Sequence, residues 1–213
     1  MFLRMCLVIA VAVCSSSVAS AQTVVGPIEF NDSEGFTTGS TAAVTDVSGL
    51  ITFTGGQQQD FFSGAAYNNG PAAYLFINGG GGFNGAASTG DTGSILFGGG
   101  GATTASFHAA NLANGPATSF TAIGSDGSTL ATLSTQVSTL NGVDPLEILT
   151  FNAVGGVNID RIEVNLPGPA SPVNPPYAAT IDTFSATIAN VPEPSSVVLL
   201  SLAACCTVIR RRR

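Results

Sequence analysis

The feature that most constrains the fold of this chain is a succession of short segments rich in β-branched and aromatic residues, separated by turn residues. Several segments alternate apolar and polar side chains, as in Ile51-Thr52-Phe53-Thr54, which is the period of a half-buried strand. Asp126-Gly127 and Asn141-Gly142 are dipeptides typical of hairpin turns. Strands of this length and spacing predict an all-β fold, and we expect a two-sheet antiparallel β-sandwich of the jelly-roll type.

We expect strands at Val24–Phe30, Ala42–Val47, Leu50–Thr54, Tyr74–Asn78, Ser94–Phe97, Ala105–Ala109, Ser119–Ile123, Thr129–Leu133, Leu146–Phe151, Asn158–Leu166 and Ile181–Ile188. The apolar alternation changes phase within Asn158–Leu166, which predicts a β-bulge near Asp160-Arg161.

The N-terminal 21 residues have the pattern of a secretory signal peptide. Arg4 precedes a short apolar run that ends in small residues, and Ala19 and Ala21 form an A-x-A cleavage site. The run is shorter than the ~20 apolar residues that span a bilayer. We therefore expect residues 1–21 to be removed and residues 22–190 to form the folded domain.

The C-terminus, residues 191–213, has three parts in a fixed order. The first part is Val191, Pro192, Glu193 and Pro194, the second is an apolar run that predicts a short helix, and the third is Arg210, Arg211, Arg212 and Arg213. An apolar helix followed by arginines is a stop-transfer pattern that keeps the positive charge on the cytoplasmic side. The run is short for a permanent membrane anchor, so we expect the inner membrane to hold the tail transiently.

This tail resembles the PEP-CTERM sorting signal. The resemblance implies recognition and cleavage near the motif by a membrane enzyme of the exosortase type. Proteins with such tails are associated with bacteria that make extracellular polysaccharide. The expected localisation is therefore export, retention in the membrane by the tail, and then the cell surface or extracellular matrix.

Charge and cysteine content restrict what the region between the two ends can do. Its only cation is Arg161, against thirteen carboxylates between Gln22 and Pro194, which gives a formal charge of one minus thirteen, or −12. This charge disfavours nucleic-acid binding. All four cysteines lie in the two terminal segments, so the domain has no disulfide and no thiolate metal site.

Three segments of the domain, Asp126–Leu130, Ile159–Val164 and Ala179–Ser185, are similar to the end of jelly-roll carbohydrate-binding modules. The resemblance implies that the first and last strands are neighbours and that acidic residues from both hold a structural Ca²⁺. The matching ligands are Glu29 or Asp32 near the start and Asp182 near the end. The alternative is that these three are solvated residues at a sheet edge.

No catalytic constellation is evident, and we expect the chain not to be an enzyme. His108 is the only histidine, and no serine lies in a G-x-S-x-G motif. The chain has no tryptophan, and the best polar-aromatic cluster for sugar contact is Tyr67-Asn68-Asn69. The expected function is that of a non-catalytic surface or matrix protein associated with extracellular polysaccharide. The alternatives are a carbohydrate-binding module with structural calcium, or a polysaccharide-active enzyme.

Overall fold

The computed structural model describes residues 22–38, 40–60, 72–78, 92–112, 117–136, 146–166 and 177–189. All of them lie in one compact unit, Gln22–Ala189. The expected signal cleavage site (Ala19 and Ala21), the motif at 191–194, the arginines at 210–213, the Tyr67 cluster and Asn141-Gly142 lie outside the described residues. Within the described ranges, no helix has the length and apolar character needed to cross a membrane.

The described elements are strands and one short 3₁₀ helix, η1, which spans Asp32–Glu34. The strands are β1 (Gln22–Ile28), β2 (Val44–Thr45), β3 (Ile51–Thr54), β4 (Gln57–Asp60), β5 (Ala72–Asn78), β6 (Thr92–Phe97), β7 (Ala102–Leu112), β8 (Ser119–Gly124), β9 (Thr129–Ser134), β10 (Glu147–Asn152), β11 (Ile159–Asn165) and β12 (Tyr177–Ala189). The predicted all-β class is therefore confirmed.

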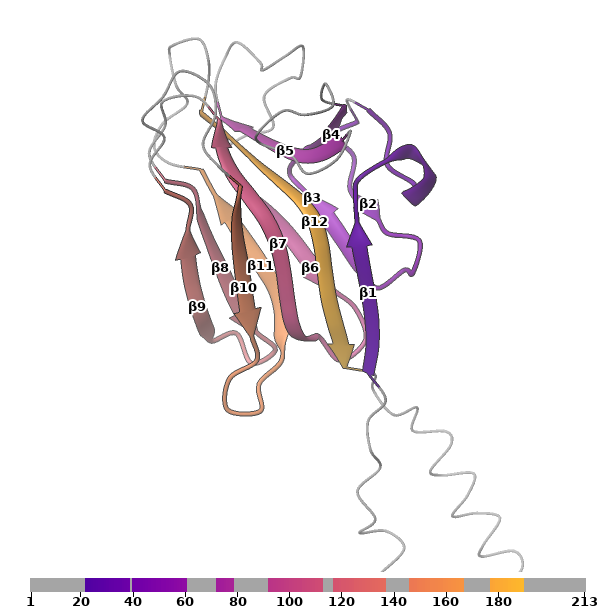
Figure 1. Cartoon of the computed structure of the whole chain (residues 1–213). Helices are drawn as coiled ribbons and strands as arrows, with labels where there is room; N and C mark the ends of the chain where they lie inside the picture. Colours follow the sequence, from indigo (N-terminus) through magenta and orange to yellow (C-terminus); the bar gives the residue numbers. More distant parts are fainter. Residues whose placement is uncertain are drawn as a thin grey trace, which may run out of the picture. The chain divides into compact units, whose positions relative to one another are not determined.

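All twelve strands belong to one antiparallel sheet that curls into two arms. We call the order β9-β8-β11-β6-β3-β2 arm A. Arm B contains β10, β7 and β12, followed by β1 and β5 on the far edge of β12 and then β4. Ladder pairing joins the arms only at Ile159 and Ala102 in the described residues. The first and last strands are neighbours, as the resemblance implied (Figure 1).

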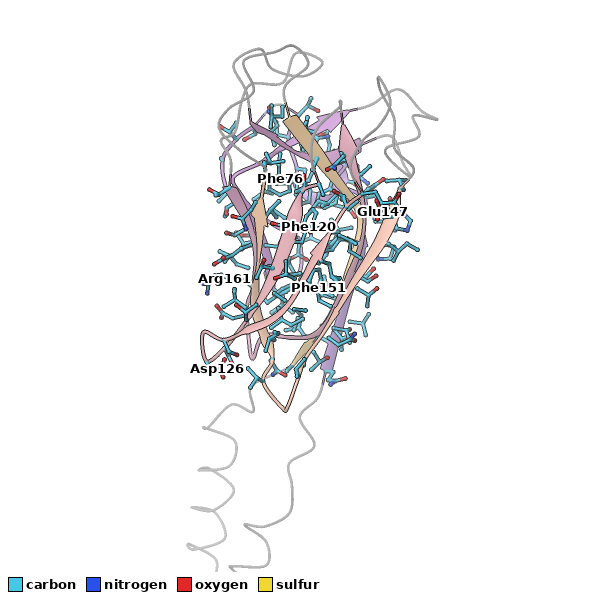
Figure 2. All side chains as sticks on the ribbon, turned by 90° about the vertical axis from the view of Figure 1, so that its left-hand side faces the viewer. Phe76, Phe120, Asp126, Glu147, Phe151 and Arg161 are labelled. Carbon is cyan, nitrogen blue, oxygen red and sulfur yellow. The ribbon has the colours of Figure 1, made fainter. Side chains whose placement is uncertain are left out.

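The inner faces of the two arms pack on one another through aromatic rings. The Phe107 ring of arm B lies 5.2 Å from that of Phe120 in arm A, and Phe53 of arm A lies 5.3 Å from Phe184 of arm B. Such edge and tilted contacts add to the burial of apolar area. Figure 2 shows Phe76, Phe120 and Phe151 among the inner side chains and Arg161 on the outer side.

Each expected strand segment overlaps an observed strand, whereas β4 was not predicted. The expected bulge near Asp160-Arg161 is confirmed, because the pairing of β11 with β8 shifts register between Ile159 and Arg161. The Asp126-Gly127 hairpin is also confirmed and joins β8 to β9. Gly127 has φ +82°, and the Asp126 carboxylate accepts bonds from the Ser128 N–H (2.9 Å) and hydroxyl (2.6 Å).

Candidate functional site

The structure brings together two of the three predicted metal ligands, because β1 and β12 are neighbours. Glu29 follows β1 directly, and Asp182 lies within β12. The Thr183 hydroxyl donates to Glu29 Oε2 at 3.4 Å, which links the two strands beside the acids. Asp32 lies in η1 and is exposed. The pair is therefore Glu29 and Asp182.

Asp182 is fully buried where β12 departs from regular pairing. It lies opposite His108 of β7, and the register shifts between Asp182 and Ser185. The Asp182 carboxylate accepts a hydrogen bond of 2.7 Å from the Thr183 N–H. Thr183 has φ +47°, a region that β-branched residues rarely occupy. The bulge thus fixes both the acid and the hydroxyl that reaches Glu29.

Glu34, which sequence reasoning missed, completes the acidic group by folding η1 back on the end of β1. Its two carboxylate oxygens accept from the Glu29 N–H at 3.1 and 2.9 Å, and Oε2 also accepts from the Asn31 N–H at 3.2 Å. This is a capping box, in which Asn31 in turn accepts from the Ser33 N–H. The pattern N-x-x-E at residues 31–34 was the available signal.

These neighbours determine the acidity of Glu29. Burial raises the pKa of its carboxyl above the ordinary 4.5, and the negative charge of Asp182 raises it further. The hydrogen bond from Thr183 lowers that pKa, the charge of Glu34 raises it and His108 lowers it. A raised carboxyl pKa means that the environment disfavours the anion. We call Glu29, Glu34, Asp182 and His108 the Glu29 cluster.

The calcium hypothesis requires more ligands than this cluster provides. Ca²⁺ takes about six to eight oxygens. Across the part of the chain that the structure describes, no group of three His, Cys, Asp or Glu side chains is arranged to hold a metal ion. The Glu34 oxygens are already used on backbone N–H groups. A calcium ion bound there would therefore need further oxygen ligands beside Glu29 and Asp182.

His108 of β7 lies between an acidic neighbour on β12 and an apolar neighbour on β10. His108 pairs with the buried Asp182 across the β7–β12 ladder, and its Nδ1 is buried with no hydrogen-bond partner among the described residues. On its other side, His108 pairs with Ile148 of β10, an exposed apolar residue without a polar side-chain group.

A groove of about 240 Å³ lies beside the Glu29 cluster, between β1 and the turn at Asp46-Ser48. Val24 and Val47 on its walls are 74% and 77% exposed. The Asp46 carboxylate accepts from the Ser48, Leu50 and Ile51 N–H groups at 3.0, 3.2 and 2.8 Å, so it holds the turn. The surface that lines the groove is mainly apolar.

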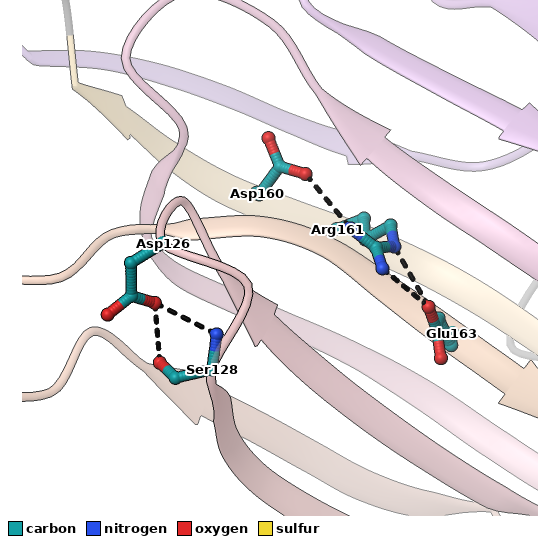
Figure 3. A network of polar contacts seen from close by, with 5 residues as sticks. All are labelled: Asp126, Ser128, Asp160, Arg161 and Glu163. Carbon is teal, nitrogen blue, oxygen red and sulfur yellow. Dashed lines mark hydrogen bonds and ion pairs between the residues drawn. The ribbon is translucent and has the colours of Figure 1, made fainter.

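The second charged group contains Arg161 and lies on the outer face of arm A (Figure 3). Its guanidinium contacts Glu163 at 2.8 Å and Asp160 at 3.3 Å. The hydrogen bond with Glu163 is the main cause of a raised Arg161 pKa. The three side chains are 35–50% exposed, so solvent screens the pairs. We call these residues the Arg161 network.

Hydroxyl side chains surround this network in rows that run across arm A. One row contains Thr54, Ser94, Glu163, Thr121 and Thr132, each paired with the next across neighbouring strands. The Thr121 and Thr132 hydroxyls are 3.2 Å apart, within hydrogen-bonding distance. The outer face of arm A thus offers polar donors and acceptors.

The described aromatic side chains do not reach the surface. Nine phenylalanines and Tyr74 are buried, and the most exposed of them, Phe97, is only 7% exposed. Burial raises the pKa of Tyr74 to about 12. Sugar recognition by ring stacking is therefore absent from the described surface, and polar side chains would have to make the contacts there.

Comparison with known proteins assigns no family. No family model and no curated protein matches the chain. Among solved structures, the chain is similar to a Stig cyclase, Fisc from Fischerella sp. TAU, crystallised with (3Z)-3-(1-methyl-2-pyrrolidinylidene)-3H-indole. The alignment has 11% identity and a TM-score of 0.32, and covers 83% of this chain and 93% of that one. A likeness at this level supports no inference about the function of this chain.

Proposed function

We propose that this chain is an exported, non-catalytic surface or extracellular-matrix protein, sorted by its PEP-CTERM-like tail and associated with extracellular polysaccharide. The observation that carries the proposal is the order of Pro192-Glu193-Pro194, an apolar run and the terminal arginines in residues 191–213. In this proposal the processing enzyme is of the exosortase type, and the inner membrane holds the precursor only until cleavage.

The domain suits such a role through its outer surface. Hydroxyl rows on arm A, and the Ser106 and Thr150 hydroxyls 3.0 Å apart on arm B, provide hydrogen-bonding groups without exposed aromatic rings. The negative charge of the domain favours solubility outside the cell. In the finer fold proposal, the two arms are the layers of a jelly-roll sandwich, which the pairing of β1 with β12 supports.

The test is the intact mass and cell fraction of the protein from its native host. The expected mature species begins at Gln22, ends near Pro192-Glu193-Pro194, and occurs in the surface or polysaccharide fraction. Deletion of residues 192–213 should abolish sorting, whereas the domain variant Glu163→Gln should be processed like the wild type. A membrane-bound species that keeps Arg210 to Arg213 would refute the sorting proposal.

A carbohydrate-binding module with structural calcium is the second candidate, and the raised pKa of Glu29 beside Asp182 favours it. Two carboxylates that disfavour each other's charge attract a divalent cation. If calcium binds, chelation lowers the melting temperature and added Ca²⁺ restores it, whereas Asp182→Asn removes the response. An unchanged melting temperature after chelation would eliminate this candidate, and silence on a glycan array would count against sugar binding.

A further inference from the structure

Among the described strands, one edge of β9 pairs with no other strand. β9 forms a ladder only with β8 in the described structure. Its sequence from Thr129 to Ser134 contains no charged residue, glycine or proline. Natural sheets usually protect such edges with charges, proline, bulges or short length, because an unpaired row of N–H and C=O groups recruits other strands.

The other edges in the described structure carry such protection. β1 is interrupted by Gly26-Pro27, where its register with β12 also shifts, and β2 has only two residues. β4 ends in Asp60, and β10 begins with Glu147. β9 has one irregularity, where its pairing with β8 skips Leu130. The segment Ala131–Ser134 remains regular and unprotected.

The apolar core also reaches the surface at β9. Five hydrophobic residues pack against the core while remaining partly exposed, and three of them, Leu130, Ala131 and Leu133, belong to this strand. A second strand placed along β9 would cover part of this apolar surface. Association there would gain both backbone hydrogen bonds and apolar burial.

The charge of the domain and of β9 restricts which partner could pair with this edge. A chain with formal charge −12 between Gln22 and Pro194 repels a second copy over most of its surface. Two β9 edges bring no charged side chain of either strand into opposition. An uncharged edge gives no attraction to a cationic or acidic partner. A second copy of the same chain would continue both the outer hydroxyl row at Thr132 and the apolar side at Ala131 and Leu133, so it fits this edge best.

We propose that two copies of this chain pair antiparallel through β9, about a two-fold axis at Thr132. Residues directly opposite in an antiparallel pair share a face of the sheet. In this register Thr132 faces the partner's Thr132 in the outer hydroxyl row, and Ala131 faces the partner's Leu133 on the inner side. Such an interface is isologous and closes as a dimer.

A cysteine introduced at Thr132 tests this register. Opposite residues in an antiparallel pair have Cα atoms about 4.5–5.5 Å apart, within the range of about 4.4–6.8 Å for disulfides. In the full chain with Cys6, Cys14, Cys205 and Cys206 replaced by serine, oxidised Thr132→Cys should form a covalent dimer. The control Thr150→Cys, at an exposed site on edge strand β10, should stay monomeric. Equal cross-linking of both variants, or none in either, would overturn the proposal.

Sedimentation of the otherwise unmodified full chain in detergent provides the second test. Thr132→Lys should weaken dimerisation at least about tenfold by placing two like charges opposite each other, whereas Thr150→Lys should leave it unchanged. Added salt should strengthen the wild-type dimer by screening the repulsion between copies. A monomer at every concentration, with normal processing of the tail, would refute the pairing and leave the proposed function intact.

Discussion

The Glu29 cluster and the Arg161 network are both groups of charged side chains, but they differ in burial, in the pairing of their charges and in backbone conformation. The Glu29 cluster sets Glu29 near the buried Asp182 and near Glu34. The Arg161 network pairs one cation with two carboxylates in partial contact with solvent. The acids of the Arg161 network lie next to a positive charge, whereas the negative charges of the Glu29 cluster repel one another.

The two groups also differ in backbone conformation, which is less favourable at the Glu29 cluster. Phe30 and Thr183, which adjoin Glu29 and Asp182, have φ values of +54° and +47°. Such values cost about 1–3 kcal/mol each in residues other than glycine. Arg161 and its partners lie on a strand without a positive φ. Unfavourable charge and unfavourable backbone therefore coincide at the Glu29 cluster, which identifies it as the better functional candidate.

The largest expected effect comes from Gly26→Ala, which would separate β1 from β12 beside the Glu29 cluster. Gly26 has φ +104°, and a Cβ there would clash with the Phe184 carbonyl oxygen and lie 2.9 Å from Ser185 Cα. We expect a loss of about 3 kcal/mol in the free energy of unfolding, measured by urea denaturation.

Gly127→Ala is the matched control, since Gly127 has φ +82° and open space around its Cα. It should lose only about 1–2 kcal/mol, the cost of the left-handed backbone alone. Equal losses in the two variants would show that the close approach of β1 to β12 does not matter.

Glu29→Gln should stabilise the domain at neutral pH, by about 0.5 kcal/mol because solvent screens a partly exposed group. The folded state raises the pKa of Glu29, so it holds the proton more tightly than the unfolded chain. The stability from Glu29 is present below pH 4.5 and is lost as pH rises through the folded pKa. Melting temperatures from about pH 4 to about pH 8 should therefore fall less in the variant. Glu163→Gln, the control, should show no such gain.

Arg161→Gln should change the free energy of unfolding by about 0.5 kcal/mol or less, because exposed ion pairs contribute little. Unfolding at low and high salt should differ less for the variant than for the wild type, since salt screens the lost pairs. A loss comparable to that of Gly26→Ala would contradict the contrast between the two groups.

The smallest effect is expected at Asp126, an exposed acid outside both groups. The Ser128 hydroxyl, and then its N–H, lower the pKa of Asp126 below its ordinary 3.8. Their stabilising contribution is therefore present above pH 3.8 and is lost as pH falls through the folded pKa. Ser128→Ala should move the Asp126 pKa toward 3.8 in an NMR titration while the melting temperature at neutral pH changes little.

The strands were predictable wherever alternation and turn chemistry coincide, as at Ser119–Gly124 and its Asp126-Gly127 turn. β4 was missed because Gln57, Gln58 and Gln59 show no alternation and carry no apolar signal. Its strand form depends on pairing with β5, which no local pattern reports. The small residues at both ends of β7 likewise concealed how far that strand extends.

The Glu29 cluster was predictable only in part. The resemblance paired the first strand with the last and so placed Glu29, which follows β1, near Asp182, which lies in β12. It could not indicate that Asp32 would face solvent while Glu34 turned back to cap Glu29 and Asn31. The opposition of His108 and Asp182 depends on the register of β7 with β12, which is set by long-range packing.

The place of β12 in the sheet has a mechanical consequence. β12 has thirteen residues, pairs with β7 along one edge and with β1 and β5 along the other, and ends at Ala189. A pulling force applied at Ala189 therefore enters the domain through a strand that is bonded on both sides. Backbone bonds on both edges resist its extraction together, so the strand nearest the tail is also the one best placed to bear tension.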